Sequence, residues 1–399
     1  MHRYASEVAD PVILRERLGF EQPPYRLPYE QMDLSAGIGV LGLPWVMHTM
    51  TLPAYRAARY NLVAGCDINP DRIADTRRGG PTPSRFIDDW KDLVHDPEVQ
   101  VVDCCFGHQP GRQEHRLAVV EEAVKAGKPV QIQKPPAMSL AIAEQMAETA
   151  REGGIQLTVN QNCRYNPANY TVKQLLTPQR LGKPRIIELQ SYWRGNPRTT
   201  EMTPATVSHT IHHVDLLRWW IGSECKSVYA KSLADSTLAI YEFENGTVVY
   251  HMENHSGVQA HEVQVRINAE NAIIQSAHNW NWHLPTSKEH DYVHVWPMGQ
   301  SKEAPLRLPL PEHVYEPIWS EVNPYLPHKG PFYDLAAPIA GMMDSMGMLL
   351  HATVTGETPD NHIDKSLKAY RIALAAHLSS ETGKPMSPDE VPSDVVAER

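Results

Sequence analysis

Histidine side chains gather in two short segments of the sequence, at spacings that would let them act on one ligand. A predicted helix in SHTIHHVDLLRWWIG carries three of them on one face: His209, His212 and His213. A predicted strand carries alternating residues that face one side of a sheet: His251, Glu253 and His255. Imidazole and carboxylate groups suit Zn²⁺ or Mn²⁺, so a metal site is one interpretation, with the ligands His209, His213, His251, Glu253 and His255. Because HxxHH lacks the glutamate of H-E-x-x-H, we favour a polar pocket that hydrogen-bonds hydroxyl groups and keep the metal as the alternative.

A glycine-rich segment, Gly37 to Gly42, matches G-x-G-x-x-G in its letters. The match is misleading, because IGVL within it has the composition of the buried strand itself, whereas the fingerprint belongs in the turn that follows a strand. In that register the turn is GLPWVM, which keeps only Gly42 and contains Pro44, a residue without an N–H for a phosphate. Asp67 closes the next predicted strand, where an acid can bind a ribose hydroxyl or simply cap a helix. The candidate dinucleotide contacts here are Gly42, Pro44, Trp45 and Asp67.

The elements that would position these residues differ between the two halves of the chain. Five apolar segments without polar alternation (AGIGVLG, NLVAGCD, VQVVDCCFG, PVQIQKP and IQLTVNQNC) are separated by helical segments, a pattern that predicts a parallel, doubly wound sheet. The segment WVMHTMTLPAYRA is predicted to be helical as far as Pro53, and Ser139 is the expected N-cap of a later helix. Beyond it, alternating segments with turns at ENG and AEN predict hairpins and a mainly antiparallel sheet.

We therefore expect an α/β protein with a Rossmann domain followed by an α+β domain that carries a large open sheet. The expected boundaries are an N-terminal arm over 1–34, the Rossmann domain over 35–160, the second domain over 161–385 and a tail over 386–399. A large sheet face that stays open favours a homo-oligomer, a dimer or a tetramer, formed through that face.

The composition excludes several classes of protein. The chain has 399 residues with 37 Lys+Arg and 47 Asp+Glu, a formal net charge of −10, which argues against nucleic acid as a partner. No apolar run approaches the ~20 residues of a bilayer span, so no membrane partner is expected. The charged N-terminal segment and five scattered cysteines favour the cytoplasm over an oxidising compartment.

Several motifs together resemble those of the Gfo/Idh/MocA oxidoreductases, the family of glucose–fructose oxidoreductase and inositol dehydrogenase. KAGKPVQIQKP is similar to the family's A-G-K-x-V-x-x-E-K-P, and VNQNCRYNP follows it as the family's pattern requires. Further matching pieces are DINPDR, DPEVQVVD, LGKPRIIELQ, HxxDxxxW from His212 to Trp219, FENGTV and SSETGKP. The resemblance extends over roughly residues 36–385.

The resemblance implies an NAD(P)-dependent oxidoreductase that acts on a secondary hydroxyl or ketone of a sugar, cyclitol or glycoside. The family's catalytic lysine and histidine fall on Lys134 and His212. Hydride removal from an alcohol needs a group that takes the hydroxyl proton, and a partly buried lysine at a strand end with a histidine relay meets that need. Asp215, one turn after His212, is a candidate to orient it. The remaining candidate substrate contacts are Asn162, Arg164, Tyr165, Tyr192, Trp193, His209, His213 and Asp215.

Three departures from the family pattern fall on functional positions. The glycine fingerprint is reduced to Gly42, Gln133 replaces the glutamate of E-K-P as a cofactor contact, and Ser208 stands where many members carry an acid. These changes leave two alternatives open beside an ordinary dehydrogenase using NAD or NADP. One is net non-redox chemistry on a glycoside, by transient oxidation with tightly bound NAD or by metal-assisted elimination or hydrolysis. The other is a non-catalytic ligand-binding homologue.

Overall fold

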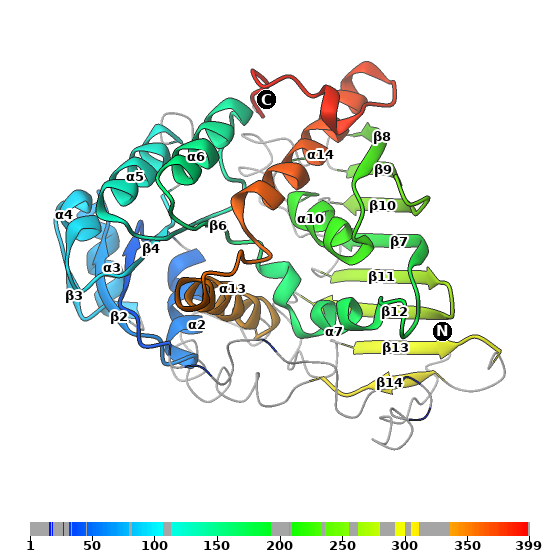
Figure 1. The fold of residues 1–399 in the computed structure, drawn as a ribbon, viewed down its shortest axis with the longest axis horizontal. Coiled ribbons are helices and arrows are strands. Elements are labelled where there is room, and N and C mark those ends of the chain that lie inside the picture. Colours follow the sequence, from blue (N-terminus) through cyan, green and yellow to red (C-terminus); the bar gives the residue numbers. More distant parts are fainter. Residues whose placement is uncertain are drawn as a thin grey trace.

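The computed structural model describes most of the chain in ten continuous segments. They are residues 34–44, 46–79, 82–106, 113–192, 210–233, 236–254, 262–279, 292–299, 305–310 and 336–397, with the single residues 16, 18, 27, 32 and 207. The described residues form two sheets with helices packed on them (Figure 1). No helix among them is both long enough and apolar enough to cross a membrane.

The first sheet has six parallel strands in the order β3-β2-β1-β4-β5-β6, the doubly wound arrangement. Its strands are β1 (Ile38–Leu41), β2 (Leu62–Cys66), β3 (Arg85–Phe86), β4 (Val101–Cys104), β5 (Val130–Ile132) and β6 (Leu157–Val159). The five expected strands are confirmed. The sixth, β3, was not expected, because two half-buried residues are too short to show a pattern.

Helices cover both faces of this sheet. They are η1 (Met47–Thr51), α2 (Leu52–Ala57), α3 (Pro70–Gly79), α4 (Trp90–His95), α5 (Gln113–Ala126) and α6 (Leu140–Glu152). Ser139 caps α6 as expected, its hydroxyl accepting from the amide of Ile142. The prediction that a helix ends at Pro53 is wrong: the chain stays helical through Ala57. Pro53 lies in the first turn of α2, directly after the π-helical turn η1, where a missing N–H is tolerated.

The second sheet has eight strands in the order β14-β13-β12-β11-β7-β10-β9-β8. They are β7 (Pro184–Tyr192), β8 (Cys225–Ser232), β9 (Ser236–Phe243), β10 (Val248–Asn254), β11 (Glu262–Ala269), β12 (Ala272–Asn279), β13 (Tyr292–Pro297) and β14 (Leu306–Leu308). All neighbouring pairs are antiparallel except β7 with β10, so the expected mainly antiparallel sheet is confirmed.

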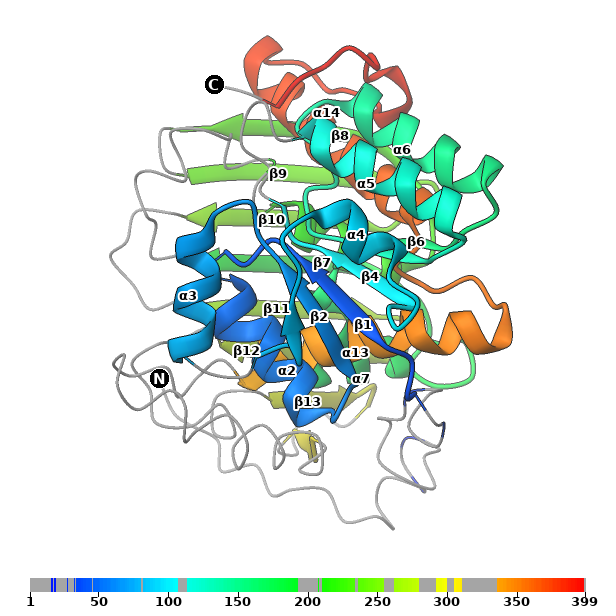
Figure 2. The same ribbon diagram turned by 90° about the vertical axis from the view of Figure 1, so that its left-hand side faces the viewer.

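Helices of the second half pack on one face of this sheet, the side seen in Figure 1. They are η2 (Asn162–Tyr165), α7 (Pro167–Leu175), α10 (Thr210–Ile221) and α14 (Ile363–Thr382), which the short turn η4 (Pro388–Glu390) follows. Figure 2 shows the first sheet in front of the second. The opposite face of the large sheet exposes apolar side chains: Ile186, Tyr229, Leu238, Ile240, Val248 and Tyr250.

The last part of the chain returns to the first sheet and ties the two halves together. Helix α13 (Ala336–Thr355) packs its apolar side chains with those of β1 and α2 in one core. A side chain at Gly341 would meet the carbonyl oxygen of Asn162 at 2.3 Å, so this glycine lets α13 approach η2 closely. Near the C-terminus, Val396 pairs with Ser139 in a β-bridge. The described part of the segment after residue 385 therefore runs from the second sheet, where Met386 forms a bridge with Val228, to the first domain.

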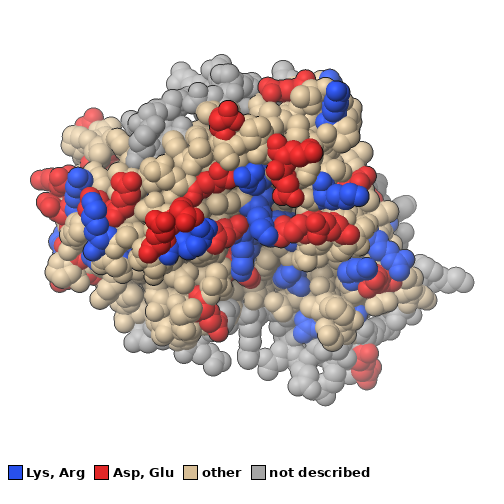
Figure 3. All heavy atoms as spheres, turned by 45° about the horizontal axis from the view of Figure 1, so that its top comes forward, with Lys and Arg blue, Asp and Glu red and all other residues tan. Residues whose placement is uncertain are grey.

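Charged side chains reinforce this connection. Acidic and basic residues are intermixed over the surface at the top of Figure 1, which Figure 3 turns forward. Between α6 and α14, Arg371 pairs with Glu144, and Arg151 pairs with Asp364 at 3.1 Å. Ion pairs this exposed contribute little individually, so the shared apolar core carries most of the stability of the contact.

Candidate active site

The carboxyl ends of the parallel strands meet at one edge of the first sheet, where ligands of doubly wound folds bind. Gly42 follows β1, Asp67 follows β2, and Lys134 comes two residues after β5. The 160–162 segment follows β6, which pairs with β5. The sequence-predicted residues of the first domain that the structure describes are therefore gathered at this edge.

The turn after β1 requires its glycine. Gly42 has φ +82°, and a Cβ there would lie 2.9 Å from the backbone of Cys105 and Phe106. The next amide, that of Leu43, donates to Asp67 Oδ2 at 2.6 Å, and Pro44 has no N–H. Trp45 lies outside the described residues. The turn thus offers a phosphate fewer backbone donors than a three-glycine loop.

Asp67 is buried, and its carboxylate joins the turn after β1 to the start of α3. Besides accepting from Leu43, it accepts from the amide of Asn69 at 2.8 Å, and Arg72 Nη1 lies 3.5 Å away. This geometry rules out a surface acid, and the residue that caps α3 is Asn69, whose Oδ1 accepts from the amide of Asp71 at 3.0 Å. Each carboxylate oxygen of Asp67 keeps a lone pair, so the same group can also accept from a ribose hydroxyl.

Lys134 is partly buried at the end of β5. Burial lowers the pKa of its ammonium group to about 8, although the nearby Cys163 and Glu253 favour the charged form. Glu253 belongs to the second sheet, so a charge of each domain acts on the other here. An amine with this pKa can both accept and return a proton near neutral pH.

Arg116 holds the Lys134 loop in place, a role that no sequence motif predicted. Its Nη1 donates to the carbonyls of Gln133 at 3.0 Å, Pro135 at 2.6 Å and Pro136 at 3.0 Å. Its Nε donates to the carbonyl of Phe106 at 2.8 Å. The guanidinium is buried on α5, and its charge also lowers the pKa of Lys134. The only signal in the sequence was an arginine on the apolar face of an otherwise ordinary amphipathic helix.

Polar side chains at this edge have atoms that no described residue satisfies. They are Gln133 Nε2, Asn160 Oδ1, and both amide atoms of Gln161 and of Asn162. Leaving a buried polar atom without a hydrogen bond costs about 1–3 kcal/mol, so such a group marks a place for a polar ligand. The nicotinamide carboxamide and its ribose carry donors and acceptors of the required kind. The residues present therefore fit NAD: polar side chains for its nicotinamide half, and Gly42 with Asp67 for its adenosine half.

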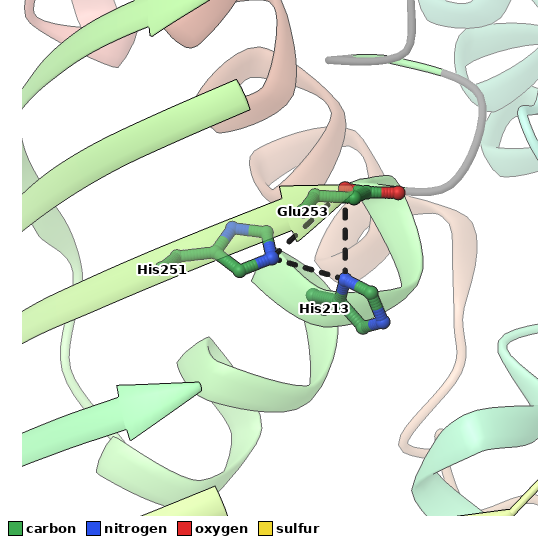
Figure 4. Close-up of side chains that lie close together, drawn as sticks. All are labelled: His213, His251 and Glu253. Atoms are coloured by element: carbon green, nitrogen blue, oxygen red, sulfur yellow. Dashed lines mark hydrogen bonds and ion pairs between the residues drawn. The ribbon is translucent and has the colours of Figure 1, made fainter. Parts of the chain in front are cut away.

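A second cluster comes from α10 and β10 and is buried (Figure 4). His213 Nδ1 lies 3.1 Å from His251 Nε2 and 3.7 Å from Glu253 Oε2, and His251 Nε2 lies 3.9 Å from the same oxygen. Three of the five residues named for the metal alternative thus converge. The other two, His209 and His255, lie outside the described residues.

Arg164 and Asp215 form a buried ion pair. Arg164 donates from Nε to Asp215 Oδ2 at 2.5 Å and from Nη2 to Oδ1 at 2.6 Å, and its Nη1 reaches the carbonyl of Asp360 at 2.6 Å. Both carboxylate oxygens of Asp215 accept from the guanidinium, so Arg164 is its main partner, and the orientation of His212 by Asp215 stays a prediction. The pair joins η2 to α10 and so fixes the helix that carries His212, which is itself buried.

Two aromatic residues predicted to contact the substrate, Tyr165 and Tyr192, do not join the cluster of His213, His251 and Glu253. Tyr165 is fully buried and packs edge-on against Trp219, 6.4 Å between ring centres. Glu253 is paired in register with Ser191, so these two side chains lie on the same face of the sheet. Tyr192 is the next residue along the strand and therefore lies on the opposite face. Its hydroxyl donates there to Gln190. The structure does not bring Tyr192 to His213. Trp193 and Ser208 lie outside the described residues.

Comparison with known proteins agrees with this architecture. Residues 36–161 match the family model described as oxidoreductase family, NAD-binding Rossmann fold, and residues 170–275 match that of the GFO/IDH/MocA C-terminal domain. An inositol 2-dehydrogenase/D-chiro-inositol 3-dehydrogenase of Lactiplantibacillus plantarum is 23% identical over 48% of this chain and 54% of its own length. An inositol 2-dehydrogenase of Salmonella paratyphi B is 26% identical over 60% of this chain and 69% of its own. The first of these alignments thus spans little more than half of the relative.

Solved structures extend the likeness in fold to nearly the whole chain. A levoglucosan dehydrogenase solved with NADH and levoglucosan has a TM-score of 0.70 at 16% identity, covering 90% of this chain and 100% of its own. A probable dehydrogenase from Thermotoga maritima has a TM-score of 0.68 at 18% identity, covering 89% and 100%. The matched domains, their order and the strand-end site agree: this chain belongs to the Gfo/Idh/MocA oxidoreductase family, with an NAD-binding Rossmann domain at its N-terminal end.

Proposed function

We propose that this protein is an NAD-dependent dehydrogenase that interconverts a secondary hydroxyl and a ketone on a sugar, cyclitol or glycoside. The observation that carries the proposal is Lys134, whose pKa of about 8 suits proton exchange, at the strand edge where the fold binds its cofactor. The names of the relatives, inositol and levoglucosan dehydrogenases, support this class of substrate.

In the oxidative direction, the neutral amine of Lys134 takes the proton of the substrate hydroxyl, and the carbon–oxygen single bond becomes a carbonyl. A bound NAD⁺, held by the polar side chains at this strand edge, would supply the acceptor for the hydride of the same carbon. His212 relays the proton from Lys134 toward water. In the reductive direction the ammonium form of Lys134 returns the proton to the oxygen.

Other residues hold the reactants and the catalytic loop. Gln133 and Asn162 bind polar groups of the nicotinamide half or of the substrate through amide atoms that no described residue satisfies. Arg116 fixes the Lys134 loop, and the Arg164–Asp215 pair fixes α10. The carboxylate of Asp67 would repel a 2′-phosphate, which favours NAD over NADP.

The proposal extends to assembly and compartment. The open face of the large sheet exposes Leu238 and Ile240, 42% and 43% accessible, among several apolar neighbours, which supports a homo-oligomer formed through this face. All five cysteines are buried free thiols, which suits a reducing compartment such as the cytoplasm.

The test is reduction of NAD⁺ or NADP⁺ by the purified protein with myo-inositol, levoglucosan and a panel of aldoses and glycosides. The absorbance of reduced nicotinamide reports turnover. We expect activity with NAD⁺ that Lys134→Ala abolishes and that Lys384→Ala, at an exposed lysine, leaves unchanged. Turnover by Lys134→Ala at the wild-type rate would contradict the proposal. Nucleotide recovered from the denatured protein would identify a retained cofactor.

A further inference from the structure

We propose that His213, His251 and Glu253 form a binding site for a divalent transition-metal ion, with Zn²⁺ as the best-suited ion. The site lies where α10 packs on β10 (Figure 4). All three residues belong to the second domain, and the proposal does not depend on the dehydrogenase activity.

The geometry of the three ligand atoms carries the proposal. His213 Nδ1, His251 Nε2 and Glu253 Oε2 are separated by 3.1, 3.7 and 3.9 Å. A single point about 2.1 Å from all three atoms satisfies these separations, and this is the length of Zn–N and Zn–O bonds in proteins. In Figure 4 the two rings and the carboxylate turn these atoms toward one another.

The surroundings of the three residues are those of a built site. Tyr241 Oη lies 3.2 Å from His251 Nδ1, the ring nitrogen that faces away from the cluster. Metal-bound histidines usually donate this second N–H to such a partner, which leaves the other ring nitrogen unprotonated and able to bind the ion. The hydroxyl of Thr210 donates to Glu253 Oε2 and holds the carboxylate in place. The side chains of His251 and Glu253 are fully buried, and that of His213 is nearly so.

The ligand types select the ion. Two imidazoles and one carboxylate form the His₂Glu set of catalytic zinc sites, whereas Mg²⁺ and Ca²⁺ prefer oxygen ligands throughout. The point about 2.1 Å from all three atoms lies almost in their plane, so tetrahedral binding would draw the two longer separations in to about 3.4 Å. The ion would then have three protein ligands, and its fourth position would take a water or an oxygen of a bound molecule.

A purely protonic network is the competing explanation, since one proton shared by His213 and His251 would also bring their nitrogens to 3.1 Å. Metal binding by the full-length protein, freed of metal with a chelator and dialysed, distinguishes the two. Calorimetric titration with Zn²⁺, without nucleotide or substrate, should give one ion per chain. Titration with Co²⁺ should give the intense visible absorption of a tetrahedral site.

The variants are His251→Gln and Glu253→Gln, with His95→Gln as the matched control. His95 is an exposed histidine whose Nε2 lies 3.1 Å from Glu122 Oε2, so it carries the same pair of groups outside the site. We expect the two site variants to lose the bound ion and the control to retain it. Tyr241→Phe keeps the packing and should weaken Zn²⁺ binding about 10–100-fold.

Wild-type protein that binds no Zn²⁺, or that shows no tetrahedral Co²⁺ spectrum, would overturn the proposal even if a site variant fails to fold. Equal binding by wild type and His251→Gln would also overturn it. Neither result would affect the proposed dehydrogenase activity, because the titrations contain neither nucleotide nor substrate.

Discussion

Replacing Lys134 by methionine should make the protein more stable and inactive at the same time. The surroundings of Lys134 lower its pKa from 10.5 to about 8, so at neutral pH folding must hold a charge in a place that disfavours it. The full shift corresponds to about 3 kcal/mol. Because the side chain keeps some contact with water, we expect a gain in unfolding free energy of about 1–2 kcal/mol for Lys134→Met at pH 7.

The pH dependence of this gain has a definite sign. The unfolded chain binds a proton at this lysine up to its ordinary pKa, whereas the folded protein releases it above about 8. The penalty on the wild type is therefore complete below about pH 8 and fades as the pH rises toward the ordinary value. The advantage of Lys134→Met should shrink accordingly between pH 7 and pH ~10.

Urea unfolding of wild type, Lys134→Met and the control Lys384→Met at both pH values measures these differences. Lys384 is exposed, so its replacement should change the unfolding free energy little at either pH. A Lys134→Met variant that is less stable than wild type at pH 7 would refute the reasoning. So would a stability difference that does not change with pH.

Four further predictions follow from the same contacts. In the oxidative direction, kcat/KM should rise about tenfold per pH unit below the Lys134 pKa of about 8 and level off above it, as a pH profile would show; a flat profile would contradict a base at Lys134. Arg116→Met should lower kcat and the unfolding free energy, the latter by about 3 kcal/mol, because four carbonyls lose their donor; unchanged kcat would remove its positioning role. Arg164→Met should cost about 3–5 kcal/mol by leaving a buried carboxylate unpaired, and adding Asp215→Leu should restore part of that loss; additive losses in urea unfolding would contradict the ion pair. Leu238→Asp should reduce the mass measured by analytical ultracentrifugation to that of a monomer, whereas an unchanged oligomer would exclude the open sheet face as the interface.

The fold followed from local patterns that a single sequence displays. Unbroken apolar strands require a sheet covered on both faces, and alternating strands require one face away from the core, so the two sheets were predictable. The placement of Lys134 and of Gly42 was predictable for the same reason, since both follow directly from where a strand ends.

Contacts between distant segments were not predictable in this way. Arg164 and Asp215 are 51 residues apart, and nothing local indicates that they pair. Arg116 reaches carbonyl groups, which carry no sequence signal at all. Packing of α13 on η2 depends on the close approach at Gly341. The position of Tyr192 could have been predicted from the alternation of its strand, which places it on the face opposite the buried Leu189.

The most direct test of the central claim is a crystal structure of the complex with NAD⁺. The nicotinamide ring should lie beside Lys134 and Gln133 at the ends of β5 and β6, with the pyrophosphate over the Gly42 turn. The account would be contradicted by a dinucleotide bound with its nicotinamide far from Lys134. It would also be contradicted if crystals grown in saturating NAD⁺ showed no nucleotide at the strand edge of the protein.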